Sequence, residues 1–593
     1  MLTTVNKLDP ITAQVIRDSF ESISSEISRV VERTAVHPLF QEVHDYSTGV
    51  FYYDGKEVSM IARATAIPVH IFASITSVEA LIKEFGSDIH EGDVFLVNDP
   101  YYGGTHAADW TMMKPVMLDN NRMIFPSVRA HMSDFGGVEP GGYNPSATDV
   151  WQEGFRIPPI RLYEKGVIRQ DMWDIVTNNS RLSEVLKGDL LAILGGCNIG
   201  ALRTKQLVEK YGVDTIVDAI DYSMEYAAKR LRSEISKWPD GVYVGERLLD
   251  HDSAKNYDIK VKATVTVQGE TIAVDFTGTD NQVPGYINSP MGNTASYVYM
   301  ALCGMFPEDM PVNSGMFRQV KIYAPEGTVV NPLEPAPVMF STVTIGGDIG
   351  EAVMNALAKI APERAGQIGQ GYCLSTTYGT DSRYNDEMYF TIEYGNTIAA
   401  DSASYGKDGW GGWSAPMCSL ILATIETQEL QFPFLYRQYE YANDSVGHGQ
   451  WRGVPSFQMK RQVYGDRPSF VNITTVGNRY PLQGFAGGHS GARSYAILRY
   501  GTDEEQIVKE SATAFMLEPN EVLFTFKGGG GGWGSPYDRD IESVLGDVMD
   551  GYVSVQTAKE IYGVVITEQQ GAYSVDHEAT ASLRQQQAEL SLS

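Results

Sequence analysis

Residues 259–267 read Ile-Lys-Val-Lys-Ala-Thr-Val-Thr-Val, so apolar and polar side chains alternate at every position. Successive side chains of a β-strand point to opposite faces, and this pattern therefore predicts a strand with one buried and one solvated face. Gln268-Gly269 follows, and a second run then leads to Phe276. Two such runs separated by a turn are typical of an antiparallel hairpin. We expect antiparallel sheet structure to begin here.

Further strands are expected on both sides of this hairpin. Residues 425–526 form a series of apolar runs separated by Gly, Asn and Asp, which indicates successive strands and turns. Residues 48–53 are followed by Asp54-Gly55, a signal for a type I′ hairpin turn. Residues 93–97 are predicted to form a buried strand that stops at the turn residues Asn98-Asp99-Pro100.

Apolar residues recur every three or four positions elsewhere, which indicates helices packed on a core. The helix that follows Asp9-Pro10 should run to about Arg33 and bury Ile16, Phe20, Ile23, Ile27 and Val30. Other helices are expected at 75–86, within 171–238 with breaks at Gly195-Gly196 and Gly212, around 294–305 and at 349–361. The fold class predicted from these elements is α+β, multidomain, with antiparallel β-sheets and flanking helices.

At 593 residues the chain exceeds the usual size of one compact core. Trp238-Pro239-Asp240-Gly241 combines helix-stop and turn signals and predicts a boundary near 240. We expect an N-terminal domain over 1–240, which carries the candidate metal site, a middle α+β domain over 241–425 and a β-rich C-terminal domain over 426–593 with a glycine-rich turn.

The charge balance disfavours several classes of partner. There are 46 Lys+Arg and 74 Asp+Glu, a net charge of −28 that repels nucleic acids and anionic membranes. No apolar run approaches the roughly 18 to 20 residues that span a bilayer. The four cysteines share no C-x-x-C spacing, so neither a disulfide framework nor a thiolate zinc site is indicated. We expect a soluble, cytoplasmic protein with no nucleic-acid or membrane partner.

Familiar nucleotide and nucleophile motifs are absent from the sequence. There is no G-x-x-x-x-G-K-[ST], no G-x-G-x-x-G opening a helix after a strand, and no G-x-S-x-G. Any ATP chemistry would therefore need a partner subunit, and covalent catalysis by this chain is disfavoured. Gly528 to Gly532 are consecutive glycines, for which a close-approach backbone turn is favoured over an anion site.

A candidate metal site lies around the stretch Asn98 to Asp109. His106 and Asp109 are three residues apart, in a glycine-introduced segment just after a buried strand. His131 follows an apolar stretch that could return it beside this loop, and Asp45 precedes another strand and offers one more carboxylate. Two imidazoles and one or two carboxylates suit Zn²⁺, Mn²⁺ or Fe²⁺ better than Ca²⁺ or Mg²⁺.

Simpler structural roles remain open for the same residues. Asp99 suits an Asx turn ahead of Pro100, and single histidines near strand ends are commonly hydrogen-bonded structural groups. The segment 152–159, Gln-Glu-Gly-Phe-Arg-Ile-Pro-Pro, could be an interface strand, a substrate loop or the site of a buried ion pair. Trp410-Gly411-Gly412-Trp413 could be a pocket wall, an interface or core packing.

Taken together, these stretches resemble the hydantoinase B family, also called oxoprolinase B. The matching pieces are Asp45-Tyr46-Ser47, Ile67-Pro68-Val69-His70, Gly92-Asp93 through Pro100, Gly103-Gly104-Thr105-His106-Ala107-Ala108-Asp109, Arg129-Ala130-His131, Asp134-Phe135-Gly136-Gly137, Gln152 through Pro159, Asn288-Ser289-Pro290 and Tyr562-Gly563-Val564-Val565. The resemblance covers nearly the whole chain, and many motifs in one order are far more specific than any one motif.

The resemblance implies a subunit that works beside an ATP-binding A-type subunit, in a hetero-oligomer such as (αβ)2. In such systems ATP and Mg in the partner phosphorylate the enol or imidate oxygen of a cyclic amide or ketone, which is then hydrolysed or carboxylated. Family members that hold a metal in this subunit use a His-x-x-Asp pair and a later His. These positions fall here on His106, Asp109 and His131, with Asp45 completing or supporting the site.

We hypothesise a metal-binding subunit of a heteromeric ATP-dependent cyclic-amide hydrolase. The metal would bind substrate or lower the pKa of a bound water. Asp134 and His70 are predicted to be supporting or proton-transfer groups, with Asp134 orienting an imidazole ligand. The alternatives are a subunit of an acetophenone-type ketone carboxylase and a non-catalytic scaffold. Residues 38–44, where many relatives carry a more polar run, leave the substrate open, whereas the chain's length favours hydrolases or acetophenone-type assemblies over acetone carboxylases.

Overall fold

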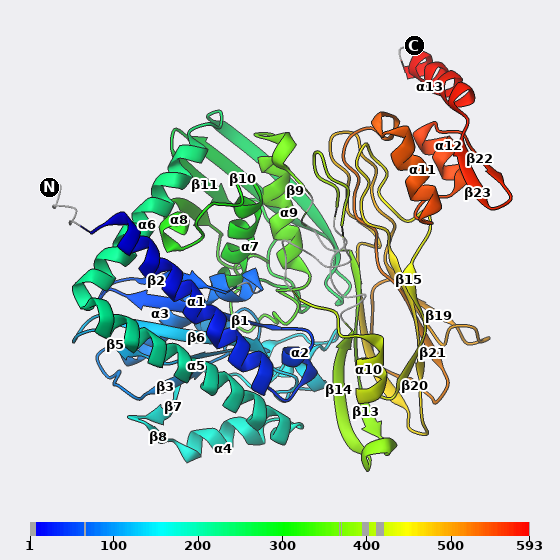
Figure 1. Ribbon diagram of the computed structural model, residues 1–593. Coiled ribbons are helices and arrows are strands. Elements are labelled where there is room, and N and C mark those ends of the chain that lie inside the picture. Colours follow the sequence, from blue (N-terminus) through cyan, green and yellow to red (C-terminus); the bar gives the residue numbers. More distant parts are fainter. Residues whose placement is uncertain are drawn as a thin grey trace. The chain divides into compact units, whose positions relative to one another are not determined.

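The structure is a computed structural model that describes residues 8–64, 67–366, 368, 371–393, 402–410 and 420–591 (Figure 1). The chain divides into two compact units. Unit 1 comprises Met1–Arg247, Lys260–Ala356 and Pro416–Ala423, and unit 2 comprises Leu248–Ile259, Leu357–Ala415 and Thr424–Ser593. The predicted α+β class with antiparallel sheets is confirmed. The domain boundaries expected near 240 and 425 stay predictions.

The first sheet of unit 1 has eight strands in the order β2-β1-β6-β4-β3-β7-β8, with β5 also paired to β6. All of these pairs are antiparallel. The strands are β1 (Tyr46–Tyr53), β2 (Val58–Arg63), β3 (Val94–Val97), β4 (Asp109–Met113), β5 (Val116–Met117), β6 (Met123–His131), β7 (Ile160–Glu164) and β8 (Val167–Ile168). The buried strand predicted at 93–97 is confirmed by β3.

Helices α3 (Pro68–Phe85) and α5 (Ser183–Tyr211) cover opposite faces of this sheet. Arg129 of β6 donates to Ser77 of α3 over 2.7 Å, whereas Pro126 of the same strand lies against Gly200 of α5. Because alternate residues of a strand point to opposite faces, His131 shares the α3 face with Arg129. This face carries the site described below.

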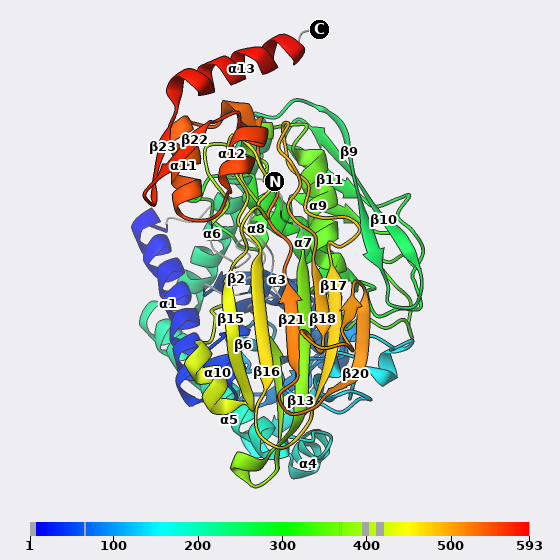
Figure 2. The same ribbon diagram turned by 90° about the vertical axis from the view of Figure 1, so that its right-hand side faces the viewer.

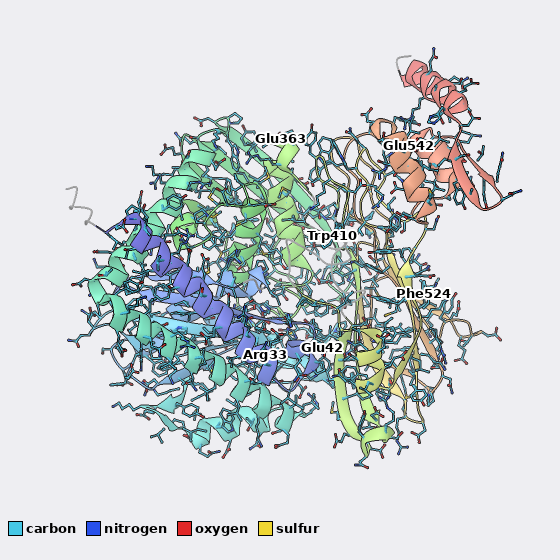
Figure 3. All side chains as sticks on the ribbon, in the orientation of Figure 1. Arg33, Glu42, Glu363, Trp410, Phe524 and Glu542 are labelled. Atoms are coloured by element: carbon cyan, nitrogen blue, oxygen red, sulfur yellow. The ribbon has the colours of Figure 1, made fainter. Side chains whose placement is uncertain are left out.

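Helix α1 (Pro10–Thr34) begins at the predicted residue and ends one residue beyond Arg33, which marks its last turn in Figure 3. The side chain of Asp9 accepts a hydrogen bond from the Thr12 amide and caps the helix. The predicted stripe is buried except at its end, where Val31 rather than Val30 is fully covered. The stripe packs against α5 and the edge of the first sheet.

The break predicted at Gly195-Gly196 is wrong, because α5 continues through both residues and ends at Gly212. A Cβ atom on Gly196 would lie 3.0 Å from the side chains of Ile27 and Val31 on α1. A Cβ atom on Gly200 would lie 2.6 Å from Ile27. These glycines therefore allow α1 and α5 to pack closely and do not interrupt the helix.

By length and composition, α5 could cross a membrane, which the search for apolar runs did not predict. Its most apolar 18-residue window has a mean hydropathy of 1.4, and 56% of that window is buried. The helix also packs against α1 and β6. This packing accounts for its composition as that of a core helix.

The hairpin between β1 and β2 differs from the prediction. Four residues, Asp54 to Glu57, separate the two strands, whereas a type I′ turn has two. The Asp54 carboxylate accepts hydrogen bonds from the amides of Lys56 and Glu57 over 2.7 and 2.8 Å. The aspartate therefore closes the longer loop through its side chain.

The second sheet has the order β12-β11-β10-β9, made of β9 (Gly241–His251), β10 (Tyr257–Gln268), β11 (Thr271–Asp275) and β12 (Val320–Tyr323). Residues 259–267 lie in β10 with their apolar side chains buried and their polar ones half exposed, and β10 pairs antiparallel with β11 as predicted. The β11–β12 pair is parallel. Helix α7 (Met291–Gly304) confirms the helix expected near 294–305, and α9 (Ile345–Leu357) covers most of the one expected at 349–361.

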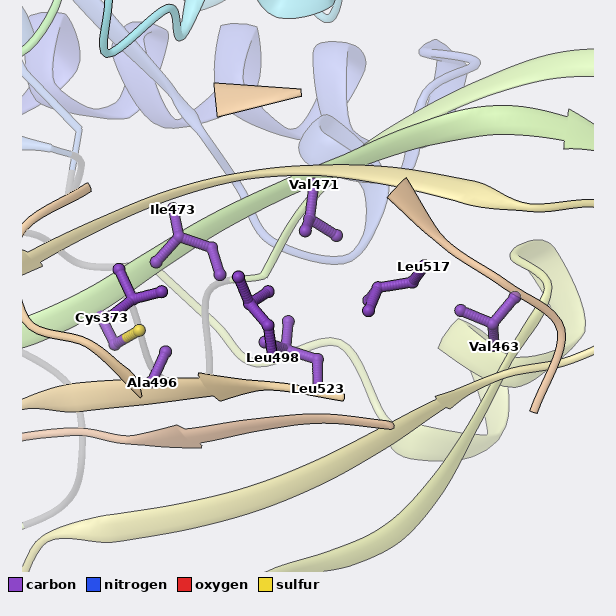
Figure 4. Close-up of a cluster of buried hydrophobic side chains, with 9 residues drawn as sticks. Cys373, Val463, Val471, Ile473, Ala496, Leu498, Leu517 and Leu523 are labelled. Carbon is purple, nitrogen blue, oxygen red and sulfur yellow. The ribbon is translucent and has the colours of Figure 1, made fainter. Parts of the chain in front are cut away.

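Unit 2 contains two antiparallel sheets, ordered β14-β13-β17-β20 and β15-β16-β21-β18-β19 (Figure 2). Their strands are β13 (Tyr372–Asp381), β14 (Glu387–Glu393), β15 (Phe434–Tyr441), β16 (Phe457–Val463), β17 (Ser469–Val476), β18 (Tyr495–Leu498), β19 (Gln506–Val508), β20 (Ser511–Leu517) and β21 (Val522–Phe526). Cys373 and Ile473 of the first sheet and Leu498 and Leu523 of the second belong to one buried cluster (Figure 4). The two sheets therefore pack face to face. The strand series predicted over 425–526 is confirmed after the initial helix α10 (Ile425–Gln431).

The end of the chain adds helices α11 (Ile541–Met549), α12 (Val555–Tyr562) and α13 (His577–Ser591) and the hairpin β22 (Ile566–Gln569)–β23 (Ala572–Val575). Val544, Val548, Tyr562 and Val564 are among the residues of a separate buried cluster here. The last part of unit 2 thus has a small core of its own.

The five glycines Gly528 to Gly532 are an interior backbone segment. Cβ atoms on Gly529, Gly531 and Gly532 would each lie within 2.2 Å of a backbone carbonyl oxygen of another segment. The close backbone approach predicted for this run is confirmed. All five amides donate to acceptors within the chain, so they are not offered to an anion. Gly411 to Trp413 of the predicted aromatic segment lie outside the described residues.

Candidate metal centre

Three strand ends bring the predicted site residues together. Asp109 is the first residue of β4 and pairs directly with His131, the last residue of β6. The His131 amide also donates to the Asp45 carbonyl oxygen over 3.1 Å, which places Asp45, just before β1, beside them. His106 lies three residues ahead of Asp109, where the Asp109 amide donates to its carbonyl oxygen. Sheet register therefore joins residues that the sequence separates by more than 80 positions.

Imidazole nitrogens surround one oxygen of Asp109. Its Oδ1 lies 2.8 Å from His106 Nε2, 3.2 Å from His70 Nε2 and 3.5 Å from His131 Nδ1. The carboxylate of Asp45 lies slightly farther out, 3.9 Å from His70 Nε2 and 4.0 Å from His131 Nδ1. All five side chains are buried.

These close approaches are not hydrogen bonds. Within the described chain, His106 Nε2 and Asp109 Oδ1 are buried and have no hydrogen-bond partner, although they are only 2.8 Å apart. His131 faces Asp109 through Nδ1. Buried polar atoms are almost always paired, so unpaired atoms that converge need an explanation. Ligand atoms of His106, Asp109 and His131 all lie within 4.8 Å of one another, a spacing that could hold one metal ion. Two imidazoles and a carboxylate are the donors that Zn²⁺, Mn²⁺ and Fe²⁺ accept.

The surrounding chain fixes which atoms face the cluster. His106 Nδ1 donates a hydrogen bond to the carbonyl oxygen of Met339 over 2.8 Å. The lone pair of Nε2 is therefore left to bind a metal. The Thr105 hydroxyl donates to Asp109 Oδ2, which leaves Oδ1 facing the imidazoles. Such outer contacts are typical of metal sites, where they fix the tautomer and direction of each ligand.

The electrostatics of the cluster favour an ionised Asp109. Burial alone would raise the pKa of its carboxyl group, but the neighbouring His106 and His70 outweigh burial and hold that pKa well below its usual range. Asp109 is therefore available as an anionic ligand at any physiological pH.

A buried arginine lies behind the cluster on the same face of the sheet. Arg129 donates to Thr111 and Ser77 over 2.7 Å and to the His70 carbonyl oxygen over 3.3 Å. Burial lowers its pKa to about 10, while Asp109 acts in the opposite direction. Arg129 remains charged, and its hydrogen bond to the His70 carbonyl oxygen stabilises the first turn of α3.

Asp134 is not where its predicted role requires it. Its carboxylate accepts hydrogen bonds from the amides of Gly141 and Arg181 and from the Arg181 guanidinium, over 3.2, 2.6 and 3.0 Å. The structure does not bring it to an imidazole. The group that orients His106 is instead the Met339 carbonyl oxygen, which lies 233 positions away and carries no side-chain signal.

His70, in contrast, lies directly against Asp109 and Asp45 at the distances given above. Its Nδ1 has no hydrogen-bond partner among the described residues. It is as close to the carboxylates as the predicted ligands are, which supports either an additional ligand or a proton-holding group.

Two further residues were missed by the sequence analysis. Glu153, wholly buried, accepts a hydrogen bond from the Met339 amide over 2.7 Å, and burial raises its pKa to about 8. Tyr143 stacks on His131 with ring centroids 5.7 Å apart. Glu153 belongs to the sequence segment 152–159, which was considered for other roles. Only the fold shows that it binds the Met339 amide, whose residue also accepts the hydrogen bond from His106.

The structure also bears on the simpler structural roles considered for Asp99 and for residues 152–159. The Asp99 carboxylate accepts a hydrogen bond from the Tyr101 amide over 2.9 Å, so the predicted Asx turn is confirmed. Arg156 of the 152–159 segment forms ion pairs with Asp99 over 2.8 Å and with Glu334 over 2.7 Å. These contacts agree with the ion-pair interpretation of that segment, and the interface-strand and substrate-loop interpretations stay predictions.

Comparison with known proteins gives consistent relatives. A family model described as hydantoinase B/oxoprolinase matches residues 9–536. The chain is 32% identical to caprolactamase subunit beta of Pseudomonas jessenii over 98% of this chain and 100% of that one. The crystal structure of the ATP-dependent caprolactamase from Pseudomonas jessenii matches with a TM-score of 0.89 and 30% identity, again over 98% and 100% of the two chains. A nucleotide-free acetone carboxylase structure has the same fold, with a TM-score of 0.86, 19% identity and coverage of 98% of this chain and 83% of that one.

Proposed function

This chain belongs to the hydantoinase B/oxoprolinase family, and from that premise we propose that it is the metal-binding subunit of a heteromeric, ATP-dependent cyclic-amide hydrolase. The reaction would open a hydantoin, oxoproline or lactam ring after a partner subunit has activated it with ATP. The observation that carries the proposal is the convergence of ligand atoms of His106, Asp109 and His131 within 4.8 Å of one another in a buried cluster. Two of these atoms, His106 Nε2 and Asp109 Oδ1, have no hydrogen-bond partner among the described residues.

The need for a partner is supported from two sides. The relative of similar length is named as a subunit, and the related crystal structure is described as ATP-dependent. The 593 residues of this chain contain no phosphate-binding loop motif. We therefore assign ATP and Mg²⁺ to an A-type partner in a complex such as (αβ)2.

In this proposal each residue has a definite task. His106, Asp109 and His131 would hold the metal, with Asp45 as a further carboxylate ligand or support. The ion would supply Lewis acidity, which polarises a substrate oxygen or lowers the pKa of water. His70, 3.2 Å from Asp109, is placed to hold a proton at Nε2 next to the reacting groups. Met339 and Thr105 fix the direction of the ligands.

The proposal is tested on the chain co-expressed with its A-type partner. We expect about one transition-metal ion per copy and ATP-dependent ring opening of caprolactam, hydantoin or 5-oxoproline. His131→Ala should abolish both metal and turnover, whereas His489→Ala, which changes an exposed histidine of unit 2, should preserve both. Ring opening by this chain without a partner, or full metal content in His131→Ala, would contradict the proposal.

A carboxylase function is the second candidate, favoured by the fold shared with acetone carboxylase. Labelled bicarbonate separates the two. Label in the product of the complex indicates carboxylation of a ketone, and an unlabelled ring-opened amino acid indicates hydrolysis. A purely structural subunit would retain bound metal and turnover in the complex after His106→Ala.

A further inference from the structure

A buried tyrosine lies beside the candidate metal centre, and its hydroxyl has no hydrogen-bond partner among the described residues. Tyr143 is 4% exposed, and its ring stacks on that of His131 with an interplanar angle of 12°. Phe340 packs edge-on against the Tyr143 ring at 5.0 Å, and the ring of His106 lies 6.4 Å away. Buried tyrosine hydroxyls usually find a hydrogen-bond partner. Among the described residues, none pairs with that of Tyr143.

The loop that carries Tyr143 is held rigidly. A Cβ atom on Gly142, whose φ is +75°, would lie 2.6 Å from the Glu153 carbonyl oxygen, so only glycine fits there. The Gly141 amide donates to the Asp134 carboxylate over 3.2 Å. Arg181 binds the same carboxylate over 3.0 Å and donates to the Gly137 carbonyl oxygen over 2.6 Å. Asp134 thus acts as a positioning residue for this loop, 137–142, and not as a partner of the imidazoles.

The Tyr143 hydroxyl carries its proton at neutral pH, because the ordinary pKa of a tyrosine is about 10. A protonated hydroxyl is a hydrogen-bond donor, and no acceptor in the described chain uses it. A fixed, unused donor beside a candidate metal is placed to serve a bound ligand.

We propose that Tyr143 donates a hydrogen bond to the reacting oxygen held at the metal centre. As water attacks the carbon of the phosphorylated imidate, the C=N electron pair moves to the ring nitrogen, which takes up a proton. The oxygen delivered by the water carries negative charge as the C–N bond then breaks to leave an acyl phosphate, and a preplaced donor stabilises that charge. The hydroxyl keeps its own proton throughout and forms no covalent bond. This inference rests on the proposed function, because it needs a ligand oxygen at the same centre.

The test compares three variants of the full chain. Tyr143→Phe keeps the stacked ring and loses only the hydroxyl, and Tyr143→Leu loses both. Tyr101→Phe is the matched control, because its hydroxyl donates to the Ala336 carbonyl oxygen over 2.6 Å within the protein. The chain is loaded with Co²⁺, and acetohydroxamate binding is followed by the visible absorption of the metal. Turnover is measured on the complex with its A-type partner.

We expect Tyr143→Phe to bind Co²⁺ as the wild type does but acetohydroxamate on the order of tenfold more weakly. Its kcat for ring opening should fall by roughly 100-fold or more with little change in KM, as for other lost oxyanion donors. Tyr101→Phe should match the wild type in all these measurements.

Wild-type acetohydroxamate affinity and kcat in Tyr143→Phe would overturn the proposal. If only Tyr143→Leu is impaired, the ring serves packing alone and the proposal also falls. A wild-type chain that takes up no Co²⁺ would remove both the proposed function and this inference. If Co²⁺ uptake is lost in His131→Ala while Tyr143→Phe keeps wild-type acetohydroxamate affinity and kcat, the proposed function stands and only this inference is overturned.

Discussion

Two clusters of charged side chains in this chain contrast sharply, one wholly buried in unit 1 and one buried in unit 2 except at the partly exposed Asp408 and Arg452. In unit 2, Arg539 donates to both oxygens of Asp408 over 2.8 Å and to Asp547 over 2.9 Å, and Arg452 donates to the other Asp547 oxygen over 2.7 Å. In unit 1, nitrogen atoms of three imidazoles lie within 3.5 Å of Asp109 Oδ1, yet this oxygen has no hydrogen-bond partner among the described residues.

We attribute the difference to a structural cluster in unit 2 and a proposed binding cluster in unit 1. The unit 2 charges satisfy one another, and removing Arg539 would take the paired cation from Asp408 and leave Asp547 with Arg452. Asp109 Oδ1 in unit 1 has no such pairing among the described residues, and under the proposed function a bound metal would complete the cluster. Mutations should therefore affect folding in the first cluster and metal binding in the second.

The largest effect is expected in the paired cluster. Arg539→Met should lower the free energy of unfolding by about 3–5 kcal/mol, because Asp408 and Asp547 lose their shared cation. Denaturant unfolding measures the loss. Unchanged stability would show that this cluster is not structural and would break the comparison.

Loss of a proposed metal ligand should weaken metal binding more than it lowers folding stability. His131→Ala should weaken metal binding by more than the roughly 10- to 100-fold that losing an outer contact costs. The metal-free chain should lose only the packing of the buried His131 ring against Tyr143, because His131 Nε2 has no hydrogen-bond partner among the described residues. Metal titration and denaturant unfolding of the chelated protein together check this, and a large loss of apo stability would contradict it.

A residue that only directs a ligand should have a smaller effect. Thr105→Val removes the hydroxyl that binds Asp109 Oδ2 and keeps the side chain's shape. Metal affinity should fall by about 10- to 100-fold, with no change in the number of ions bound per chain. Isothermal titration with Zn²⁺ measures both, and unaltered affinity would mean that Asp109 needs no such support.

The last prediction concerns the pH dependence of Glu153, a buried carboxyl group that burial favours in its neutral form. Its pKa is raised to about 8 by burial, so the folded chain binds more protons than the unfolded chain between the ordinary pKa of 4.5 and about 8. The contribution to stability is therefore full at low pH and is lost as the pH rises through this window, with a slope of at most about 1.4 kcal/mol per pH unit.

Glu153→Gln should remove that slope and keep the hydrogen bond from the Met339 amide. Unfolding free energies measured from pH 5 to 8.5 give the comparison. Parallel curves for the two proteins would show that Glu153 does not titrate in this range.

Local patterns predicted much of the fold and part of the site. Alternation over 259–267 predicted β10, and the His106–Asp109 spacing together with the family resemblance pointed to a shared cation. Proximity of His131 followed from its place at the end of a strand that returns beside β4. These signals are readable because neighbours along the chain or along one strand determine them.

The remaining features depend on contacts between distant segments. The Met339 carbonyl that orients His106 has no side-chain identity to read. Gly195-Gly196 was predicted to break a helix because the close approach of α1 could not be seen. Asp134 was assigned to the imidazoles for its position in a motif, whereas Arg181, 47 positions on, takes its carboxylate.

The central claim is that His106, Asp109 and His131 share one cation. Anomalous X-ray scattering at the absorption edge of the metal, from crystals of the complex purified without chelator, tests it most directly. We predict a single strong peak among the imidazole nitrogens and the Asp109 oxygen, within about 2.0–2.3 Å of each. Side chains that bond directly to one another with no peak between them would contradict the account.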